Sequence, residues 1–218
     1  MAGSARRSSA LSRDAIVTTA IDILDEEGEA GLTFRALAAR LATGPGAIYH
    51  HVAGKDELLT AAAERMIGEV LADASDQSDP ADGIRVLALG LFDTLDAHPW
   101  VGASMYRDPA QHGTLRVFEA LGSRIARLGL PDGARFDAAT ALLNYIVGAG
   151  VQNAANARAS VGGPGREEHL GAMADRWGDL DPGEFPFTRS VAGRLRDHDD
   201  REQFLAGVDL ILAGVRAS

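Results

Sequence analysis

The sequence predicts an all-α protein with a small N-terminal domain followed by a larger helical domain. Apolar residues recur at helical spacing along most of the 218 residues, and no stretch alternates apolar and polar residues as a half-buried strand would. A chain of this length forms roughly one to two domains. We expect a flexible tail over residues 1–10, a first domain over 11–71, a polar connector over 75–83 and a second domain over 84–217.

The first predicted helix begins after Ser12, a residue type that caps helices through its side-chain oxygen. It ends at Gly28, because glycine readily takes the left-handed conformation that terminates a helix. One side of this helix is apolar and is expected to be buried. That side consists of Ile16, Ala20, Ile23 and Leu24.

Residues 33–52 follow as a short helix, a tight turn and a second short helix. Thr33 is a good N-cap, Gly44 frees the backbone in the turn, and Pro45 stands at the first position of the second helix, where proline is accepted. A helix this short is unstable alone, so its neighbours must hold it. A helix-turn-helix unit of this kind can place its second helix in the major groove of DNA.

Longer helices account for most of the remaining chain. The helix that begins at Lys55 is expected to reach about Leu71, and glycine or proline residues separate the helices beyond it. The segment 158–184 is the weakest-structured part, where we expect mobility and only a short amphipathic turn between Leu170 and Trp177. The other helices are expected at 84–97, 100–107, 110–129, 133–157, 185–197 and 200–216.

Small, aromatic and charged residues of the helix-turn-helix fall in a specific register. The register is Leu37-Ala38, Gly44, Ile48-Tyr49-His50-His51 and Lys55-Asp56-Glu57-Leu58-Leu59. These residues resemble the DNA-binding domain of the tetracycline repressor (TetR) family. One departure is Ala42, which stands where family members usually carry the turn glycine, so we expect a slightly strained or differently shaped turn.

The resemblance extends over nearly the whole chain and implies a sequence-specific DNA-binding transcriptional regulator. It further implies a repressor that a small organic ligand releases from its operator. Three alternatives stay open. They are an activator or ligand-independent repressor of the same fold, a small-molecule-binding protein that has lost DNA binding, and a buried helical hairpin without a nucleic-acid partner.

The net charge of −10 would by itself argue against a nucleic-acid partner. Residues 1–60, however, carry six basic and eight acidic side chains, whereas residues 61–218 carry fifteen and twenty-three. Most of the excess acid therefore lies outside the first domain, where it repels DNA and confines binding to one face. The acidic residues of the first domain cluster at the end of its first helix, as Asp25, Glu26, Glu27 and Glu29.

Eight residues of the motif are candidates for contact with DNA. Arg35 can bind a guanine edge through two hydrogen bonds, and His50 can assist it. The first residues of the second helix lack hydrogen-bonding side chains and offer only close approach and contact with thymine methyls. They are Pro45, Gly46 and Ala47. The residues expected to hold phosphates are Tyr49, His51 and Lys55.

The sequence lacks the motifs that are typical of other classes of function. The chain has no cysteine, which excludes disulfides and thiolate metal sites, and it has no zinc-protease, phosphate-loop or nucleophile-elbow motif. Scattered histidines such as His112 and His169 are typical of solvated side chains. No apolar run reaches the roughly 20 residues of a membrane span, and the N-terminus lacks the apolar core of a signal peptide. We therefore expect a cytoplasmic protein without enzymatic activity, metal or cofactor.

The second domain is expected to hold a ligand pocket. By alignment with the tetracycline repressor, the drug-binding histidine and asparagine fall near Leu71 and Leu87, and the metal-supporting glutamate falls at Gln152. A magnesium-tetracycline site is therefore not expected, and a small apolar or aromatic organic compound suits the remaining side chains better. The candidate residues are Leu71, Leu87, Leu91, Phe92, Trp100, Met105, Tyr106, Val117, Phe118 and Leu121, with Asn144 and Gln152 as orienting polar groups. Ordinary core packing explains any one of them equally well.

Two helices of the second domain are too apolar for the surface of a monomer. Residues 138–151 are apolar nearly all round, and residues 204–215 carry two neighbouring apolar stripes. Both segments resemble the eighth and tenth helices of the tetracycline repressor, which build a four-helix dimer interface. We therefore expect a homodimer on an inverted-repeat operator; the alternative is that these helices only fill the core of one protomer. The candidate interface residues are Ile146, Gly148, Gly150, Phe204, Val208, Ile211 and Val215.

Overall fold

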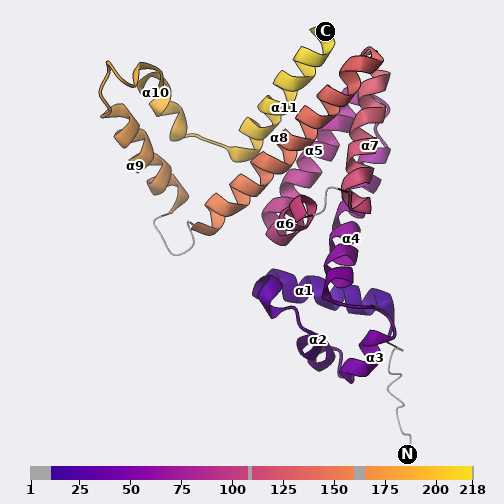
Figure 1. Ribbon diagram of the computed structural model, residues 1–218. Coiled ribbons are helices and arrows are strands. Elements are labelled where there is room, and N and C mark those ends of the chain that lie inside the picture. The colour runs from indigo at the N-terminus through magenta and orange to yellow at the C-terminus, as the bar shows by residue number, and fades with distance from the viewer. Residues whose placement is uncertain (1–10, 108–109, 160–164, 218) are drawn as a thin grey trace, which may run out of the picture.

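The computed structural model describes residues 11–107, 110–159 and 165–217, and every secondary-structure element within these ranges is a helix (Figure 1). The all-α prediction is confirmed, while the expected tail over residues 1–10 lies outside the described residues. None of the helices in these ranges is long and apolar enough to span a membrane. The helices are α1 (Arg13–Gly31), α2 (Phe34–Arg40), α3 (Pro45–Tyr49), α4 (Lys55–Ser75), α5 (Pro80–Ala97), α6 (Pro99–Arg107), α7 (His112–Arg127), α8 (Asp132–Ala159), α9 (Arg166–Gly178), α10 (Pro186–Val191), the 3₁₀ helix η1 (Ala192–Leu195) and α11 (Asp200–Ala217).

Helices α1, α2, α3 and the start of α4 pack together at one end of the molecule, and we call this unit the headpiece (Figure 1). Ser12 caps α1 by accepting a hydrogen bond from the Ala15 amide at 3.1 Å. Gly28 takes a left-handed φ of 68°, as expected at the end of a helix, but a last helical stretch follows it to Gly31. The buried side chains that form the core of the headpiece include Ile16, Ala20, Ile23, Leu37, Ile48 and Leu58.

The connection between α4 and α5 is shorter than the sequence suggested. Helix α4 continues beyond its expected end to Ser75, because Ala74 is fully buried and prolongs the apolar side of the helix. Helix α5 begins at Pro80, since the Asp79 side chain caps its first turn by accepting a hydrogen bond from the Asp82 amide at 2.9 Å. Only a few residues therefore separate these two helices.

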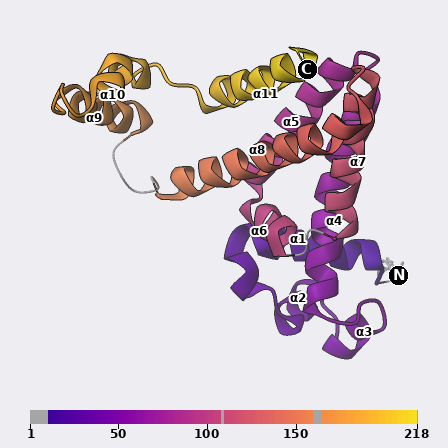
Figure 2. The same ribbon diagram turned by 45° about the horizontal axis from the view of Figure 1, so that its top comes forward.

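Helix α5 lies at the centre of the larger domain and packs against α4, α7, α8 and α11 (Figures 1 and 2). Leu87, Leu91 and Leu95 follow one another along its buried side, and all three are completely shielded from solvent. Helix α4 extends from the headpiece into this core. Its two ends consequently lie in different surroundings.

Helices α9, α10 and η1 pack on one another and stand away from the rest of the protomer in both views, and we call them the arm (Figures 1 and 2). The prediction of a weakly structured segment over 158–184 is wrong for Arg166–Gly178, which form α9. Ala174 of α9 and Ala192 of η1 are buried within the arm. Helix α9 therefore has a small apolar contact that stabilises it. Residues 160–164 of that segment lie outside the described part of the chain.

Candidate DNA-binding surface and ligand site

A side-chain cap and one buried residue stabilise the helix-turn-helix, and one residue of its turn is strained. Thr33 caps α2 by accepting a hydrogen bond from the Ala36 amide at 3.1 Å. Ile48 is fully buried and fixes α3, a helix of only 5 residues, to the headpiece core, which supplies the stability that so short a helix lacks. Ala42 takes a φ of 50°, so the turn is strained where family members usually carry glycine, as expected.

The side of the headpiece formed by α2, α3 and the start of α4 points away from the larger domain (Figure 1). Tyr49 is 56% exposed, and its ring stacks on the Phe34 ring, with centroids 4.1 Å apart and planes 3° from parallel. This stack fixes the direction of Tyr49, and the motif alone did not reveal Phe34 as its support. The exposed candidates are Arg35, Pro45, Gly46, Tyr49 and His50, and the partly exposed ones are Ala47, His51 and Lys55.

Lys55 makes a structural contact within the headpiece. Its Nζ donates a hydrogen bond to the Glu29 carbonyl oxygen at 2.5 Å and so ties the start of α4 to the end of α1. An ammonium group has three N–H donors, so this contact leaves two for a phosphate. Lys55 therefore positions the first turn of α4 whether or not it touches DNA.

The acidic residues at the end of α1 hold neighbouring helices in place. Glu26 and Glu27 both accept hydrogen bonds from the Arg40 guanidinium of α2, at 2.7 and 2.8 Å. The hydrogen bond and positive charge of Arg40 lower the pKa of Glu26 below its usual value. These two carboxylates therefore support the packing of α2 on α1.

The other two carboxylates of this cluster connect the headpiece to the larger domain. Asp25 Oδ1 accepts a hydrogen bond from the Trp100 indole Nε1 at 2.7 Å and lies 2.7 Å from Nδ1 of His98, the residue before α6. Glu29 accepts from the Arg107 guanidinium at 2.6 Å, at the other end of α6. We call these five residues the α1–α6 latch. The clustering of acidic residues was visible in the sequence, but it did not identify their partners.

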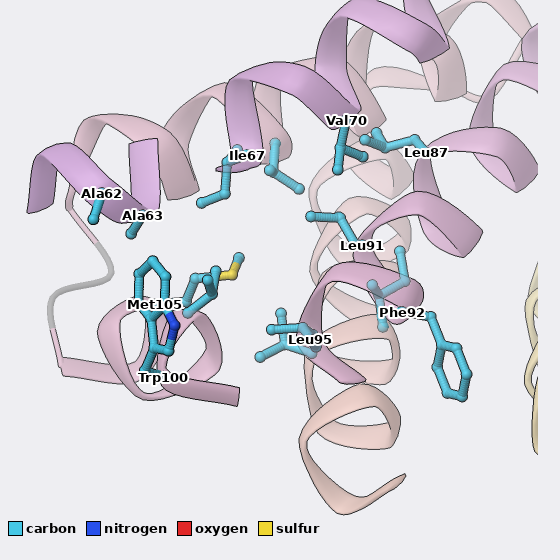
Figure 3. Packing of buried hydrophobic residues seen from close by; sticks show 14 of the residues in the cluster. Ala62, Ala63, Ile67, Val70, Leu87, Leu91, Phe92, Leu95, Trp100 and Met105 are labelled. Carbon is cyan, nitrogen blue, oxygen red and sulfur yellow. The ribbon is translucent and has the colours of Figure 1, made fainter. Parts of the chain in front are cut away.

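Seven of the predicted pocket residues are buried in the apolar core of the larger domain. Figure 3 shows Trp100 and Met105 of α6 facing α4, while Leu87 and Leu91 of α5 lie beside the far half of α4. Leu71 is only partly buried and borders an open groove of about 560 Å³ between α4 and α7. Phe118 is also partly buried. The seven are Leu87, Leu91, Phe92, Trp100, Met105, Val117 and Leu121.

Three predicted pocket residues lie outside this core. Tyr106 is 60% exposed, because the adjacent residues Ser104 and Met105 occupy the inward side of α6. Asn144 and Gln152 are exposed on α8, and their spacing of about two helical turns places both on the side that faces away from the core. These three side chains therefore lie apart from the buried group that contains the other candidates.

Most of the predicted interface residues face the core of their own protomer. A Cβ atom on Gly150 would lie 2.6 Å from Leu95 Cδ1, so this glycine permits the close contact of α8 with α5. Gly148 and Ile211 are only partly buried. The alternative, that the residue fills the core of its own protomer, is correct for Ile146, Gly150, Phe204, Val208 and Val215. The outward sides of α8 and α11 carry Ala141, Asn144, Ala206, Leu210 and Ala213.

Known proteins share this architecture. The solved structure of the transcriptional regulator SCO7222, a TetR from Streptomyces coelicolor, is 48% identical, with a TM-score of 0.86 over 95% of this chain and 98% of that chain. An HTH-type transcriptional regulator from Saccharopolyspora erythraea is 29% identical over 95% of this chain and 86% of the relative. The Streptomyces coelicolor TetR family protein ActR, solved in complex with actinorhodin, has the same fold at 24% identity, with a TM-score of 0.74 over 95% and 97% of the two chains.

Two family models match the two parts of the chain. The model of bacterial regulatory proteins of the tetR family matches residues 16–62, which include α2 and α3. The model of the tetracyclin repressor-like C-terminal domain matches residues 74–218. Together with the full-length relatives, these matches show that the chain belongs to the tetracycline repressor (TetR) family of transcriptional regulators.

Proposed function

We propose that the protein is a homodimeric repressor that binds an inverted-repeat operator and leaves it when a small organic ligand binds the larger domain. The placement of α3 carries this proposal. The helix is exposed at the tip of the headpiece, and the next helix, α4, runs from there into the buried core of the larger domain (Figure 2). A rearrangement of that core therefore has a direct route to the DNA-binding surface.

Contacts with DNA divide between sequence readout and positioning. Arg35 is exposed on α2 and reads a guanine edge, with His50 assisting at the end of α3. The segment Pro45–Ala47 presents no hydrogen-bonding side chain, so α3 approaches the bases closely there. Tyr49 and Lys55, whose directions are fixed by neighbouring residues, hold phosphates together with His51.

The dimer forms through the outward sides of α8 and α11, with the arm contributing. Leu210 is 75% exposed on α11, and the nearby exposed residues Ala206 and Ala213 are small enough to let a partner helix approach. The arm exposes Phe187 at 76%, an apolar surface that a second protomer would cover. A two-fold pair of such protomers places its headpieces on half-sites about 34 to 36 Å apart, or a multiple of that distance.

The ligand is expected to be an apolar or aromatic organic compound. ActR, which shares the fold, was solved with actinorhodin and with (S)-DNPA. A ligand releases DNA only if it binds more tightly to the arrangement of headpieces that does not fit the operator. Helix α4 and the α1–α6 latch are the connections that would transmit this preference. A coupling of about 1 to 3 kcal/mol, or roughly 5- to 150-fold in operator affinity, is ordinary for such a switch.

Selection of binding sites from a random DNA library, followed by gel shifts, tests the DNA-binding part of the proposal. The wild-type protein is expected to select an inverted repeat and to bind it as a dimer, with the mass measured by light scattering. Recovery of no repeated half-site would contradict the proposal. So would a monomeric mass at micromolar concentration.

A further inference from the structure

The junction of α6 and α7 holds the only polar side chains that are buried among the described residues. Ser104, Gln111 and Thr114 are 7%, 7% and 5% exposed. The Ser104 hydroxyl donates a hydrogen bond to Gln111 Oε1 at 3.2 Å. Within the described structure, Gln111 Nε2 and Thr114 Oγ1 are buried without any hydrogen-bond partner.

Unpartnered polar atoms inside a folded protein are rare, because losing water without gaining a hydrogen bond is unfavourable. Packing alone does not explain Thr114, since valine would fill the same space without a polar atom. Gln111 accepts the Ser104 hydroxyl through its oxygen, but this contact leaves its Nε2 unused. The two groups are therefore candidates for binding something that enters this part of the domain.

Both groups are close to the helices that connect the larger domain to the headpiece. Thr114 shares the inward side of α7 with Val117 and Leu121, which are completely buried. The intervening Gly113 packs on α4, where an added Cβ would lie 3.0 Å from Ile67 Cδ1. Ser104, which holds the Gln111 amide, belongs to α6, the helix that carries part of the α1–α6 latch.

We propose that Gln111 and Thr114 form the polar end of the ligand site and donate hydrogen bonds to a neutral oxygen acceptor on an otherwise apolar ligand. This inference rests on the proposed ligand response. Ser104 occupies the amide oxygen of Gln111, so the free amide group is a donor. The three buried polar residues are all uncharged, so the groups that meet the ligand are neutral donors, which suit a neutral oxygen acceptor. The ligand class is therefore a largely apolar compound with a neutral oxygen acceptor at these two donors, and an aromatic ketone is its simplest representative.

A matched pair of probes tests this assignment, namely 9-fluorenone and fluorene, which differ by the carbonyl oxygen. Calorimetric titration should show that the wild-type protein binds fluorenone roughly 10-fold more tightly than fluorene. The variants Gln111→Leu and Thr114→Val should each lose about 5- to 10-fold of fluorenone affinity while keeping the affinity for fluorene. Gln77→Leu, the same change at an exposed position between α4 and α5, should keep the preference.

Thermal unfolding without probe gives a second readout. If the two groups serve a ligand, Thr114→Val should raise the melting temperature, because it removes an unpartnered buried atom. Gln111→Leu should change it little, because this variant also removes the acceptor of the Ser104 hydroxyl. A lower melting temperature of Thr114→Val together with unchanged fluorenone affinity would overturn the proposal. Equal wild-type affinity for the two probes, or binding of neither, would overturn it as well.

Operator binding without any probe separates this inference from the proposed function. If the wild-type protein shifts its operator but shows no preference for fluorenone, the assignment of Gln111 and Thr114 fails and the repressor function stands. If fluorenone preference is present but no operator is bound, the repressor function fails and the ligand site stands.

Discussion

The two ends of α4 differ in the solvent exposure of the side chains around them. At the headpiece end, Tyr49 of the neighbouring α3 and His50, the residue after it, are exposed, and Ile48 is the one buried residue of this helix. At the other end, Ile67 and Val70 are buried among the helices of the larger domain (Figure 3). The headpiece can therefore act by direct contact, whereas the larger domain can act on DNA only by moving the helices that lead to the headpiece. Substitutions at the two ends should accordingly fail in different ways.

The largest expected effect is that of Gly150→Leu in the larger domain. An added Cβ already comes within 2.6 Å of Leu95 Cδ1, so a leucine should destabilise the protomer by about 3 kcal/mol. The better helix propensity of leucine, about 1 kcal/mol, is too small to compensate. Chemical denaturation measures this loss.

Gly148→Leu is the matched control on the same helix. The nearest atom to a Cβ there is the Tyr106 hydroxyl at 3.9 Å, so the protomer should fold normally. Because Gly148 is partly exposed, this variant should instead weaken the dimer in light scattering at low concentration. Equal destabilisation of the protomer by both leucines would show that the two glycines do not differ in this way.

Arg35→Ala should have the next largest effect, and it concerns DNA alone. Loss of a bidentate contact to guanine should weaken operator binding by about 1 to 3 kcal/mol and relax the preference at one base pair. Because Arg35 is exposed, the unfolding free energy should stay close to that of the wild type. Binding-site selection with the variant measures the preference, and an unchanged selected site would assign readout to another residue.

Lys55→Ala provides the comparison for Arg35. Loss of a phosphate contact should weaken binding to all DNA sequences alike. It should also reduce the slope of log affinity against log salt concentration by about one. Because Lys55 Nζ also holds the Glu29 carbonyl oxygen, this variant should lower the melting temperature too. A change of base preference in Lys55→Ala would contradict the division between readout and positioning.

The same contrast explains which features the sequence could predict. The headpiece was predictable because caps, turn and helix lie within about twenty consecutive residues, and the strain at Ala42 followed from a single residue type. In the larger domain the helices were predictable, but their orientations were not. Residues 138–151 of α8 are apolar nearly all round, so their sequence does not show that Gly150 faces α5 while Asn144 faces away. Contacts between distant segments, such as Asp25 with Trp100, have no local pattern at all.

Asp25→Ala should have an intermediate effect at the boundary of the two regions. It removes the acceptor of the Trp100 indole N–H, and a largely buried donor left unpaired costs about 1 to 3 kcal/mol. Hydrogen exchange should increase in α1 and α6 together, because the latch joins them. Glu26→Ala is the control. Its exposed partner Arg40 still forms an ion pair with Glu27 in this variant, so the free energy of unfolding should change little. Faster exchange confined to α1 would show that the latch does not couple the two regions.

The smallest expected effect is a gain of stability from Ala42→Gly in the turn between α2 and α3. Ala42 has a φ of 50°, where a side chain costs about 1 to 2 kcal/mol and glycine costs nothing. Glycine also gives the unfolded chain more freedom, which offsets part of this gain, so the net stabilisation should be about 0.5 to 1 kcal/mol. Ala39→Gly is the matched control, because Ala39 is exposed within α2 and the same change should there destabilise by about 1 kcal/mol. Urea denaturation of the two variants should therefore show shifts of opposite sign. If both variants were destabilised, the turn would tolerate alanine without strain, and the departure from the usual glycine would have no energetic consequence.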